Sequence, residues 1–202
     1  LSGQTPKIED NAFVPLVTKE GLQVMSVGFL TGDDTTPIVW RGPKATGMLT
    51  QLFSQSAWHD LDYLIVDMPP GTGDIQLTLA QRVPVVGSVI VTTPQDIALL
   101  DAKKGIEMFR KVNIRVLGVV ENMSLHICSN CGHAEEIFGA GGGERIAKDY
   151  QTELLGQLPL DKSIREQTDS GKPTVLAEPT GKIAAIYVDI ARKVAAKLAL
   201  ED

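Results

Sequence analysis

The sequence has few cysteines, no long apolar run and no excess of positive charge. Two cysteines in 202 residues are too few for a disulfide framework and favour a reducing compartment such as the cytoplasm. No apolar run approaches the length of about 18 residues that a membrane-spanning helix needs, so we expect no membrane partner. The formal net charge of −6 argues against nucleic acid as the main partner. What remains is a chain of ordinary hydrophobic content whose length suits a single domain over residues 1–202.

Apolar runs alternate with helical patterns along the chain. The runs predict strands at 22–30, 62–68, 87–93, 115–123 and 153–159. The helical patterns predict helices at 43–58, 74–83, 94–113 and 179–202. Continuous Val, Ile and Leu strands between helices indicate an α/β fold, a mainly parallel sheet with helices on both faces. Residues 124–150 form the longest stretch without clear periodicity, and long loops in compact domains are usually functional.

The turn after the 62–68 run contains residues suited to a phosphate ligand. Ligands of open parallel sheets bind beyond the carboxyl ends of the strands. There Asp67 leads into PPGTGD at 69–74. Such an aspartate can hold Mg²⁺, usually through water, and the glycines let backbone N–H groups approach a phosphate. The simpler interpretation is a tight turn before a helix, with Asp74 as its N-cap.

Two further strand ends carry polar candidates. Asn122 follows RVLGVVE, and its amide can read a purine edge by donating and accepting at once, although asparagine is also a common turn residue. Pro159 and Asp161 follow LLGQL. Asp161 is equally well explained as the N-cap of a helix.

Cys128 and Cys131 lie three residues apart in the polar sequence CSNCG, and four interpretations are open. Burial in a core requires apolar neighbours. A redox pair normally begins a helix, and GHAEE is a poor helix start. A zinc site within one chain would add His126 and His133, ligands so close in sequence that tetrahedral geometry is difficult. The fourth interpretation is a site shared by two chains, each supplying two thiolates.

Six segments follow one another in a characteristic order. They are YLIVDMPPGTGD, VTTPQDIALLDAKKGIEMF, VLGVVENMS, CSNCG, FGAGGGERIA and LGQLPLDKSIREQTDSGKP. Over about residues 20–180 the chain resembles the Mrp/ApbC family, P-loop ATPases of the MinD, ParA and nitrogenase iron protein superfamily that act as iron–sulfur cluster carriers. The resemblance implies a P-loop NTPase (SIMIBI) fold with ATP and Mg²⁺ as cofactors.

The resemblance also implies a role for each matching residue. Asp67 is similar to the Walker B aspartate, the catalytic position. Arg41, in WRGP, matches a family motif to which we assign no role. The positions that resemble a γ-phosphate switch are Gly71, Thr72, Gly73 and Asp74, and those that resemble adenosine contacts are Asn122, Pro159 and Asp161.

The family's phosphate-binding loop, G-x-x-x-x-G-K-[ST], is absent from the 202 residues. The two Gly–Lys pairs, at 171–172 and 181–182, are followed by Pro173 and Ile183 and lack the first glycine. We therefore expect the domain to be incomplete at its N-terminus, with this loop upstream of Leu1. The 202-residue chain alone is expected not to hydrolyse ATP.

The resemblance favours an ATP-dependent iron–sulfur cluster carrier that hydrolyses ATP as the full-length protein and passes a cluster to apo-proteins. A 4Fe–4S cluster takes four thiolates and each chain has two, so we expect a homodimer with the cluster held by Cys128 and Cys131 of both chains. Zinc is possible in its place. The alternatives are a spatial-regulator ATPase of the MinD/ParA kind and a zinc-stabilised binding module without ATPase activity.

Overall fold

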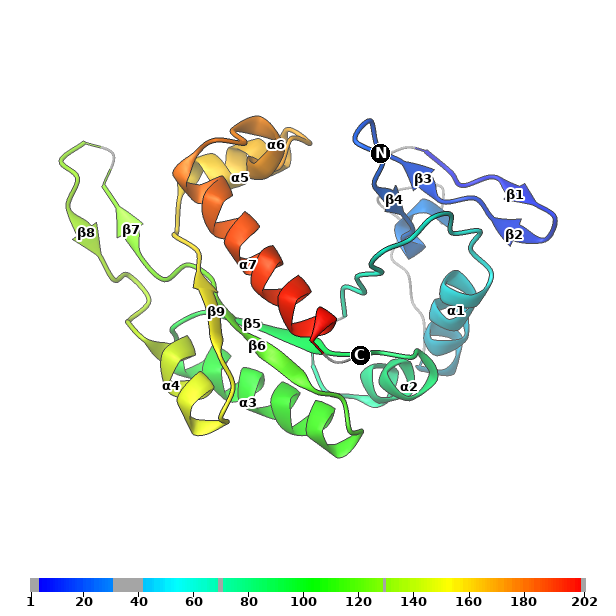
Figure 1. Ribbon diagram of the computed structural model, residues 1–202, viewed down its shortest axis with the longest axis horizontal. Coiled ribbons are helices and arrows are strands. Elements are labelled where there is room, and N and C mark those ends of the chain that lie inside the picture. Colours follow the sequence, from blue (N-terminus) through cyan, green and yellow to red (C-terminus); the bar gives the residue numbers. More distant parts are fainter. Residues whose placement is uncertain (1–3, 31–41, 69–70, 129, 201–202) are drawn as a thin grey trace. The chain divides into compact units, whose positions relative to one another are not determined.

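The structure, a computed structural model, describes residues 4–30, 42–68, 71–128 and 130–200, with the backbone alone at 42–46 and 74–75. The chain divides into two compact units, Leu1–Pro84 and Val85–Asp202. Figure 1 labels the helices and strands of both units. None of the helices in the described ranges is long and apolar enough to cross a membrane.

The second unit is built on a three-stranded parallel sheet. Its strands are β5 (Ser88–Thr92), β6 (Val116–Glu121) and β9 (Leu154–Gln157), in the order β5–β6–β9. Ile90 pairs with Val119, and Val119 with Leu154, all in parallel register. The predicted mainly parallel sheet is confirmed, and three of the five expected strands form it.

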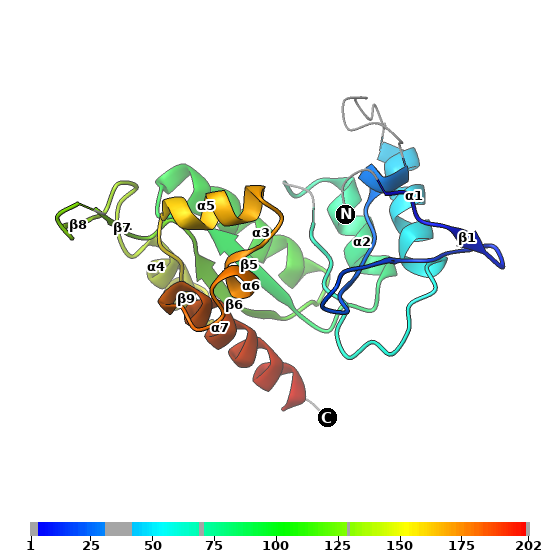
Figure 2. The ribbon, with the colours of Figure 1, turned by 90° about the horizontal axis from the view of Figure 1, so that it is seen from above.

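Helices cover both faces of this sheet, as the continuous apolar strands predict (Figures 1 and 2). One face packs against α3 (Asp96–Lys111) and α4 (Gly142–Asp149). The other packs against α7 (Lys182–Ala199). Neighbouring residues of β6 serve the two faces, because side chains alternate along a strand: Val119 joins the core under α3 and α4, and Val120 joins the core under α7.

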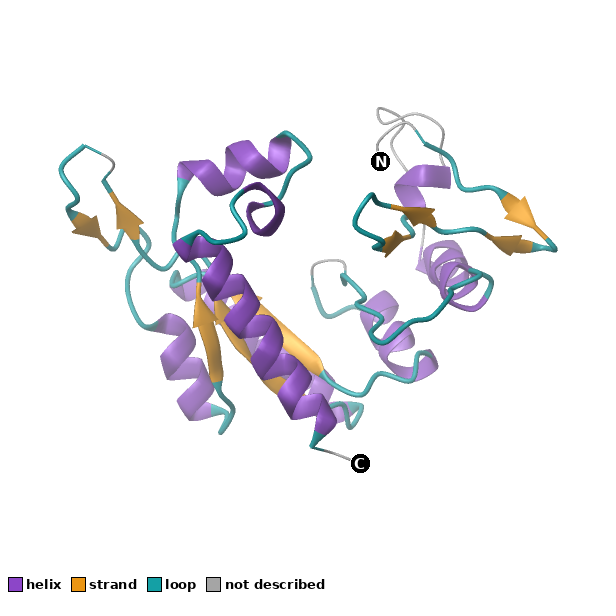
Figure 3. Ribbon diagram, turned by 45° about the horizontal axis from the view of Figure 1, so that its top comes forward, coloured by secondary structure: helices purple, strands orange, loops and turns teal. Residues whose placement is uncertain are grey.

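The second unit contains elements that periodicity did not predict. They are the hairpin β7 (His126–Ile127) and β8 (Ala134–Glu135) and the helices α4, α5 (Lys162–Asp169) and α6 (Thr174–Ala177). The β7–β8 hairpin projects away from the three-stranded sheet in each of the three ribbon views (Figures 1, 2 and 3). These elements are too short to show a helical or strand repeat, and α4 begins with glycines, which are poor helix formers.

The described residues of the first unit form short hairpins, a 3₁₀ helix and two α-helices. Its elements are β1 (Ile8–Glu9), β2 (Ala12–Phe13), β3 (Leu16–Val17), β4 (Gln23–Val24), the 3₁₀ helix η1 (Val27–Leu30), α1 (Gly42–Ser54) and α2 (Asp74–Arg82). The expected strand at 22–30 is wrong beyond β4. There the Ser26 hydroxyl accepts a hydrogen bond from the Gly28 N–H at 3.2 Å, a local turn that ends the extended conformation.

The expected strand at 62–68 is also wrong. This segment pairs with no strand in the described part of the chain, and Ile65 is 89% exposed. A run that is apolar on both faces needs neighbouring strands and covering helices to become a buried strand. The described residues of the first unit contain only two-residue strands, which pair with one another.

The first turn of α4 fits closely against α3, and this predicts a stability effect. A Cβ at Gly142 would lie 2.8 Å from Leu99 Cδ1 and 3.1 Å from Pro94 Cα. Gly142→Ala is therefore expected to lower the free energy of unfolding by about 1–3 kcal/mol, as overpacking does. Gly105→Ala is the matched control in the same unit, because a Cβ there meets only Ile90 Cδ1 at 3.7 Å. Equal denaturant midpoints for the two variants would contradict this packing.

Candidate functional site

The two cysteines lie in the turn of the β7–β8 hairpin. His126 pairs with Glu135 and Ile127 with Ala134, which sets the register. The Cys128 N–H donates to the His133 carbonyl at 2.9 Å. The Gly132 N–H donates to the Cys128 carbonyl at 2.9 Å, and Gly132 has the left-handed φ of 72° that favours glycine. Both cysteines are free, Cys128 half-buried and Cys131 exposed, so the turn presents two thiols to solvent.

The backbone of the turn favours the thiolate of Cys128. Hydrogen bonds from the backbone of Cys131, and then of Asn130, lower the pKa of Cys128 from its usual value. The Cys131 side chain lowers this pKa further, and the charge of His126 contributes least. Partial burial acts in the opposite direction. Because thiolates are the ligand and nucleophile forms of cysteine, the turn is suited to binding a soft metal.

This lowered pKa predicts how alkylation depends on pH. In Cys131→Ser, where Cys128 is the remaining thiol, the midpoint of the iodoacetamide rate against pH is expected below that of the same protein unfolded in urea. A lowered pKa means that the thiolate persists to lower pH when the chain is folded. Rates at several pH values, with the metal removed, measure the midpoint. Identical midpoints in the folded and unfolded protein would contradict the effect of the backbone.

The position of the cysteines in the hairpin turn argues against several of the four interpretations of this pair. The cysteines are partly or fully exposed, which excludes a core role, and they lie between strands rather than at the start of a helix, unlike a thioredoxin-type redox pair. Within the described ranges no group of three or more His, Cys, Asp or Glu side chains is placed to hold a metal. His126 Nδ1 already lies 2.9 Å from the Leu160 carbonyl. The two thiols therefore provide two of the four ligands that a tetrahedral metal site needs.

The sheet brings three of the nucleotide candidates to one edge. Asn122 follows β6, while Pro159 and Asp161 follow β9, and these two strands are parallel neighbours. The Asn122 Oδ1 accepts from the Met123 N–H at 2.9 Å. Asp161 is the N-cap of α5, accepting from the Ser163 N–H at 2.7 Å. The capping interpretation of Asp161 is confirmed, and a role in ligand binding remains a prediction.

The switch candidates lie in the first unit. Asp67 is exposed at the end of the 62–68 segment. Gly71, Thr72 and Gly73 precede α2, and Gly71 has a left-handed φ of 100°. Gly73 rather than Asp74 is the N-cap of α2, so the capping interpretation of Asp74 is wrong by one position. The Asp74 side chain, like Arg41, lies outside the described part of the structure.

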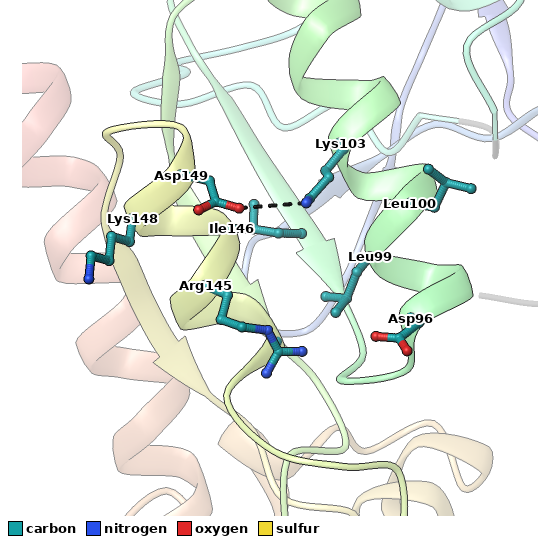
Figure 4. Close-up of a pocket in the computed structure, with 9 residues that line it drawn as sticks. Asp96, Leu99, Leu100, Lys103, Arg145, Ile146, Lys148 and Asp149 are labelled. Carbon is teal, nitrogen blue, oxygen red and sulfur yellow. Dashed lines mark ion pairs between the residues drawn. The ribbon is translucent and has the colours of Figure 1, made fainter.

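The described part of the second unit has hollows on its surface, and two of them are compared with the predicted site. One, of about 500 Å³, lies between α3 and α4 (Figure 4), where Lys103 Nζ and Asp149 Oδ2 form an ion pair at 3.6 Å; it contains none of the predicted site residues. The other, of about 460 Å³, lies between the base of the cysteine hairpin and α7. Its walls include Glu121, Gln157 and Pro159.

Sequence reasoning overlooked Glu121 and Gln157. Both end a strand of the parallel sheet, and their side chains are hydrogen-bonded to each other at 2.8 Å. The available indication was a glutamate directly after the five apolar or glycine residues of a buried strand, where an ionised side chain requires partners.

Comparisons with known proteins decide the family. A sequence model described as "ParA: NUBPL iron-transfer P-loop NTPase" matches residues 1–195. The chain belongs to this family. The resemblance deduced from the six sequence segments is thereby confirmed.

Relatives in this family are known from bacteria and from mouse. An iron–sulfur cluster carrier protein of Pseudomonas fragi is 65% identical over 189 residues, covering 94% of this chain and 66% of that protein. The Escherichia coli K12 carrier is 57% identical, with 96% and 53% covered. The mouse iron–sulfur cluster transfer protein NUBPL is 47% identical, with 96% and 60% covered. The chain thus spans roughly half to two-thirds of the length of these relatives.

Solved structures of a nucleotide-binding protein and of a MinD ATPase agree with the fold. A nucleotide-binding protein from Archaeoglobus fulgidus in complex with ADP superposes with a TM-score of 0.72 at 33% identity, covering 88% of this chain and 67% of that one. The cell division ATPase MinD of Pyrococcus furiosus gives 0.54 at 23% identity, covering 75% and 57%, a likeness of fold alone. The P-loop NTPase type of the α/β fold is confirmed.

Proposed function

We propose that this chain is the cluster-carrying part of an ATP-dependent iron–sulfur carrier, which binds a 4Fe–4S cluster and passes it to apo-proteins. One observation supports this most: a projecting hairpin carries two free thiols, of which Cys131 is exposed and Cys128 half-buried, and the backbone favours the thiolate of Cys128. Thiolates are the ligands of such clusters, and an exposed site allows ligand exchange with an acceptor. The relatives in bacteria and mouse carry names of the same kind.

The cluster is proposed to bridge two copies of the chain. Each chain supplies Cys128 and Cys131, and a two-fold axis through the hairpin turns would bring four thiolates together. Zinc suits four sulfurs as well and is the competing occupant of the same site. Because both thiols are free, we place the carrier in a reducing compartment, the cytoplasm.

ATP with Mg²⁺ is proposed to bind at the strand ends and the switch. Asn122, Pro159 and Asp161 would contact the adenosine, Asp67 would organise Mg²⁺, and the residues at 71–74 would sense the γ-phosphate. The support is the family membership and the ADP complex of the Archaeoglobus fulgidus protein.

Transfer of the cluster tests the proposal. The protein is loaded anaerobically with iron and sulfide, freed of excess reagents and mixed with an apo-ferredoxin whose own thiolates need a 4Fe–4S cluster. The acceptor is expected to gain the characteristic absorbance while the donor loses it. A chelator trap added in parallel distinguishes direct transfer from release into solution. If the acceptor gains no cluster, or gains one only from iron released into solution, a carrier role is contradicted.

A further inference from the structure

Glu121 is a glutamate with no exposed surface, at the end of β6. Each carboxylate oxygen has a partner. Oε2 accepts from the Gly143 N–H at 2.6 Å, and Oε1 accepts from Gln157 Nε2 at 2.8 Å. A buried carboxylate is costly unless its oxygens are hydrogen-bonded, so these two contacts must be kept whenever the surrounding segments are in place.

The two partners belong to different parts of the proposed machinery. Gly143 lies in the first turn of α4, the helix that follows the cysteine hairpin, and the carboxylate satisfies one of its free N–H groups. Gln157 ends β9 directly before the segment with Pro159 and Asp161. Glu121 itself precedes Asn122. The segment that carries the cysteine hairpin, residues 124–143, is called the hairpin segment. The Glu121 side chain therefore joins the end of this segment to the ends of β6 and β9.

The approach of α4 to Glu121 depends on glycine. A Cβ at Gly143 would lie 2.9 Å from Glu121 Cβ and 3.2 Å from Leu154 Cδ1. A side chain at this position would push the first turn of α4 off the carboxylate. Glycine at position 143 is thereby explained as the means of this close contact.

The beginning of the hairpin segment is hydrogen-bonded to residues 158–160, which directly follow Gln157. The Ser124 N–H donates to the Leu158 carbonyl at 3.0 Å, and the Leu160 N–H donates to the Leu125 carbonyl at 2.9 Å. His126 Nδ1 lies 2.9 Å from the Leu160 carbonyl. Both ends of the hairpin segment are thus held to residues 157–160, one through backbone bonds and the other through the Glu121 side chain.

We propose that Glu121 is a positioning residue that couples the cysteine hairpin to the nucleotide-binding strand ends. A shift of residues 157–161 when nucleotide binds would move Gln157, and the buried carboxylate would carry the start of α4 with it, because leaving either partner unpaired is costly. This role requires the two hydrogen bonds of the Glu121 side chain and not a long-range effect of its charge. The inference rests on the proposed function and adds the residue that connects its two sites.

Three variants separate positioning from mere support of the fold. Gln157→Ala removes the contact to β9 and leaves the cap on Gly143. Glu121→Ala removes both contacts. Glu121→Gln keeps both, since its amide oxygen can accept from Gly143 while its NH₂ donates to a reoriented Gln157 amide. Gln51→Ala, an exposed glutamine on α1, is the matched control.

The readout is the nucleotide response, defined as the ratio of cluster-transfer rates with and without MgATP in the full-length protein. Wild type, Glu121→Gln and Gln51→Ala are expected to share a ratio different from one. Gln157→Ala and Glu121→Ala are expected to bring it close to one, while ATP affinity and iron content per chain stay at wild-type values for Gln157→Ala.

The outcomes are distinguishable from failure of the proposed function. If wild type takes up no cluster, the carrier proposal fails. If wild type loads and transfers its cluster but shows no nucleotide response, or if Gln157→Ala retains the full response, the coupling role of Glu121 is overturned and the carrier proposal stands. Because Gln157 ends an edge strand and its side chain is partly exposed, its variant is expected to fold even if Glu121→Ala does not.

Discussion

Replacing Cys128 and Cys131 together with alanine is expected to reduce iron uptake in anaerobic reconstitution from roughly four irons per dimer, the content of one 4Fe–4S cluster, to almost none. Each single alanine variant is expected to do nearly the same, because a dimer then retains two thiolates instead of four. Iron and sulfide analysis together with visible absorbance measures the loss. A double variant that loads as well as wild type would contradict the assignment of these ligands.

His133→Ala is the control for this experiment. His133 takes part in the hairpin through its backbone carbonyl, which accepts from the Cys128 N–H, so removal of its imidazole leaves the turn intact. A cluster or zinc ion held by four cysteines is indifferent to this change, whereas a zinc site within one chain that uses His133 would lose a ligand. Wild-type loading by His133→Ala is expected.

Asp67→Asn is expected to reduce ATP hydrolysis by the full-length protein to background while leaving its fold intact. The carboxylate is proposed to organise Mg²⁺ at the γ-phosphate, and the amide has nearly the same shape without the charge. Steady-state phosphate release measures the rate, and circular dichroism checks the fold.

Asp62→Asn is the matched control for Asp67→Asn, because Asp62 is a second exposed aspartate of the same apolar segment. It is expected to hydrolyse ATP at the wild-type rate. An unchanged rate for Asp67→Asn would show that Asp67 is simply an exposed aspartate, and equal losses in both variants would indicate a general effect of charge on this segment.

The sequence predicted the sheet of the second unit because its strands are buried on both faces. Continuous apolar runs specify β5, β6 and β9, and the long amphipathic patterns specify α3 and α7. The same reasoning failed at 62–68. An apolar run indicates that a segment can be buried, but a buried strand also needs neighbouring strands to pair with, and the run does not show whether they are present. Helices of only about two turns, such as α4, show too little repeat to be recognised.

The candidate site was predictable to the extent that its residues are neighbours in sequence. The cysteine pair and the N-cap at Asp161 are local patterns, which the structure places as a hairpin turn and a helix start. The contacts of Glu121 could not be read in this way. Its partners are 22 and 36 residues away, and only the folded sheet brings them together.

The native mass of the reconstituted protein tests the central proposal most directly. After anaerobic loading, mass spectrometry under non-denaturing conditions is expected to find two chains plus the mass of one 4Fe–4S cluster, and the Cys128→Ala and Cys131→Ala proteins are expected to lack that added mass. A metal-bearing species with a single chain, or a cluster retained in the double alanine variant, would contradict a cluster shared between two hairpins.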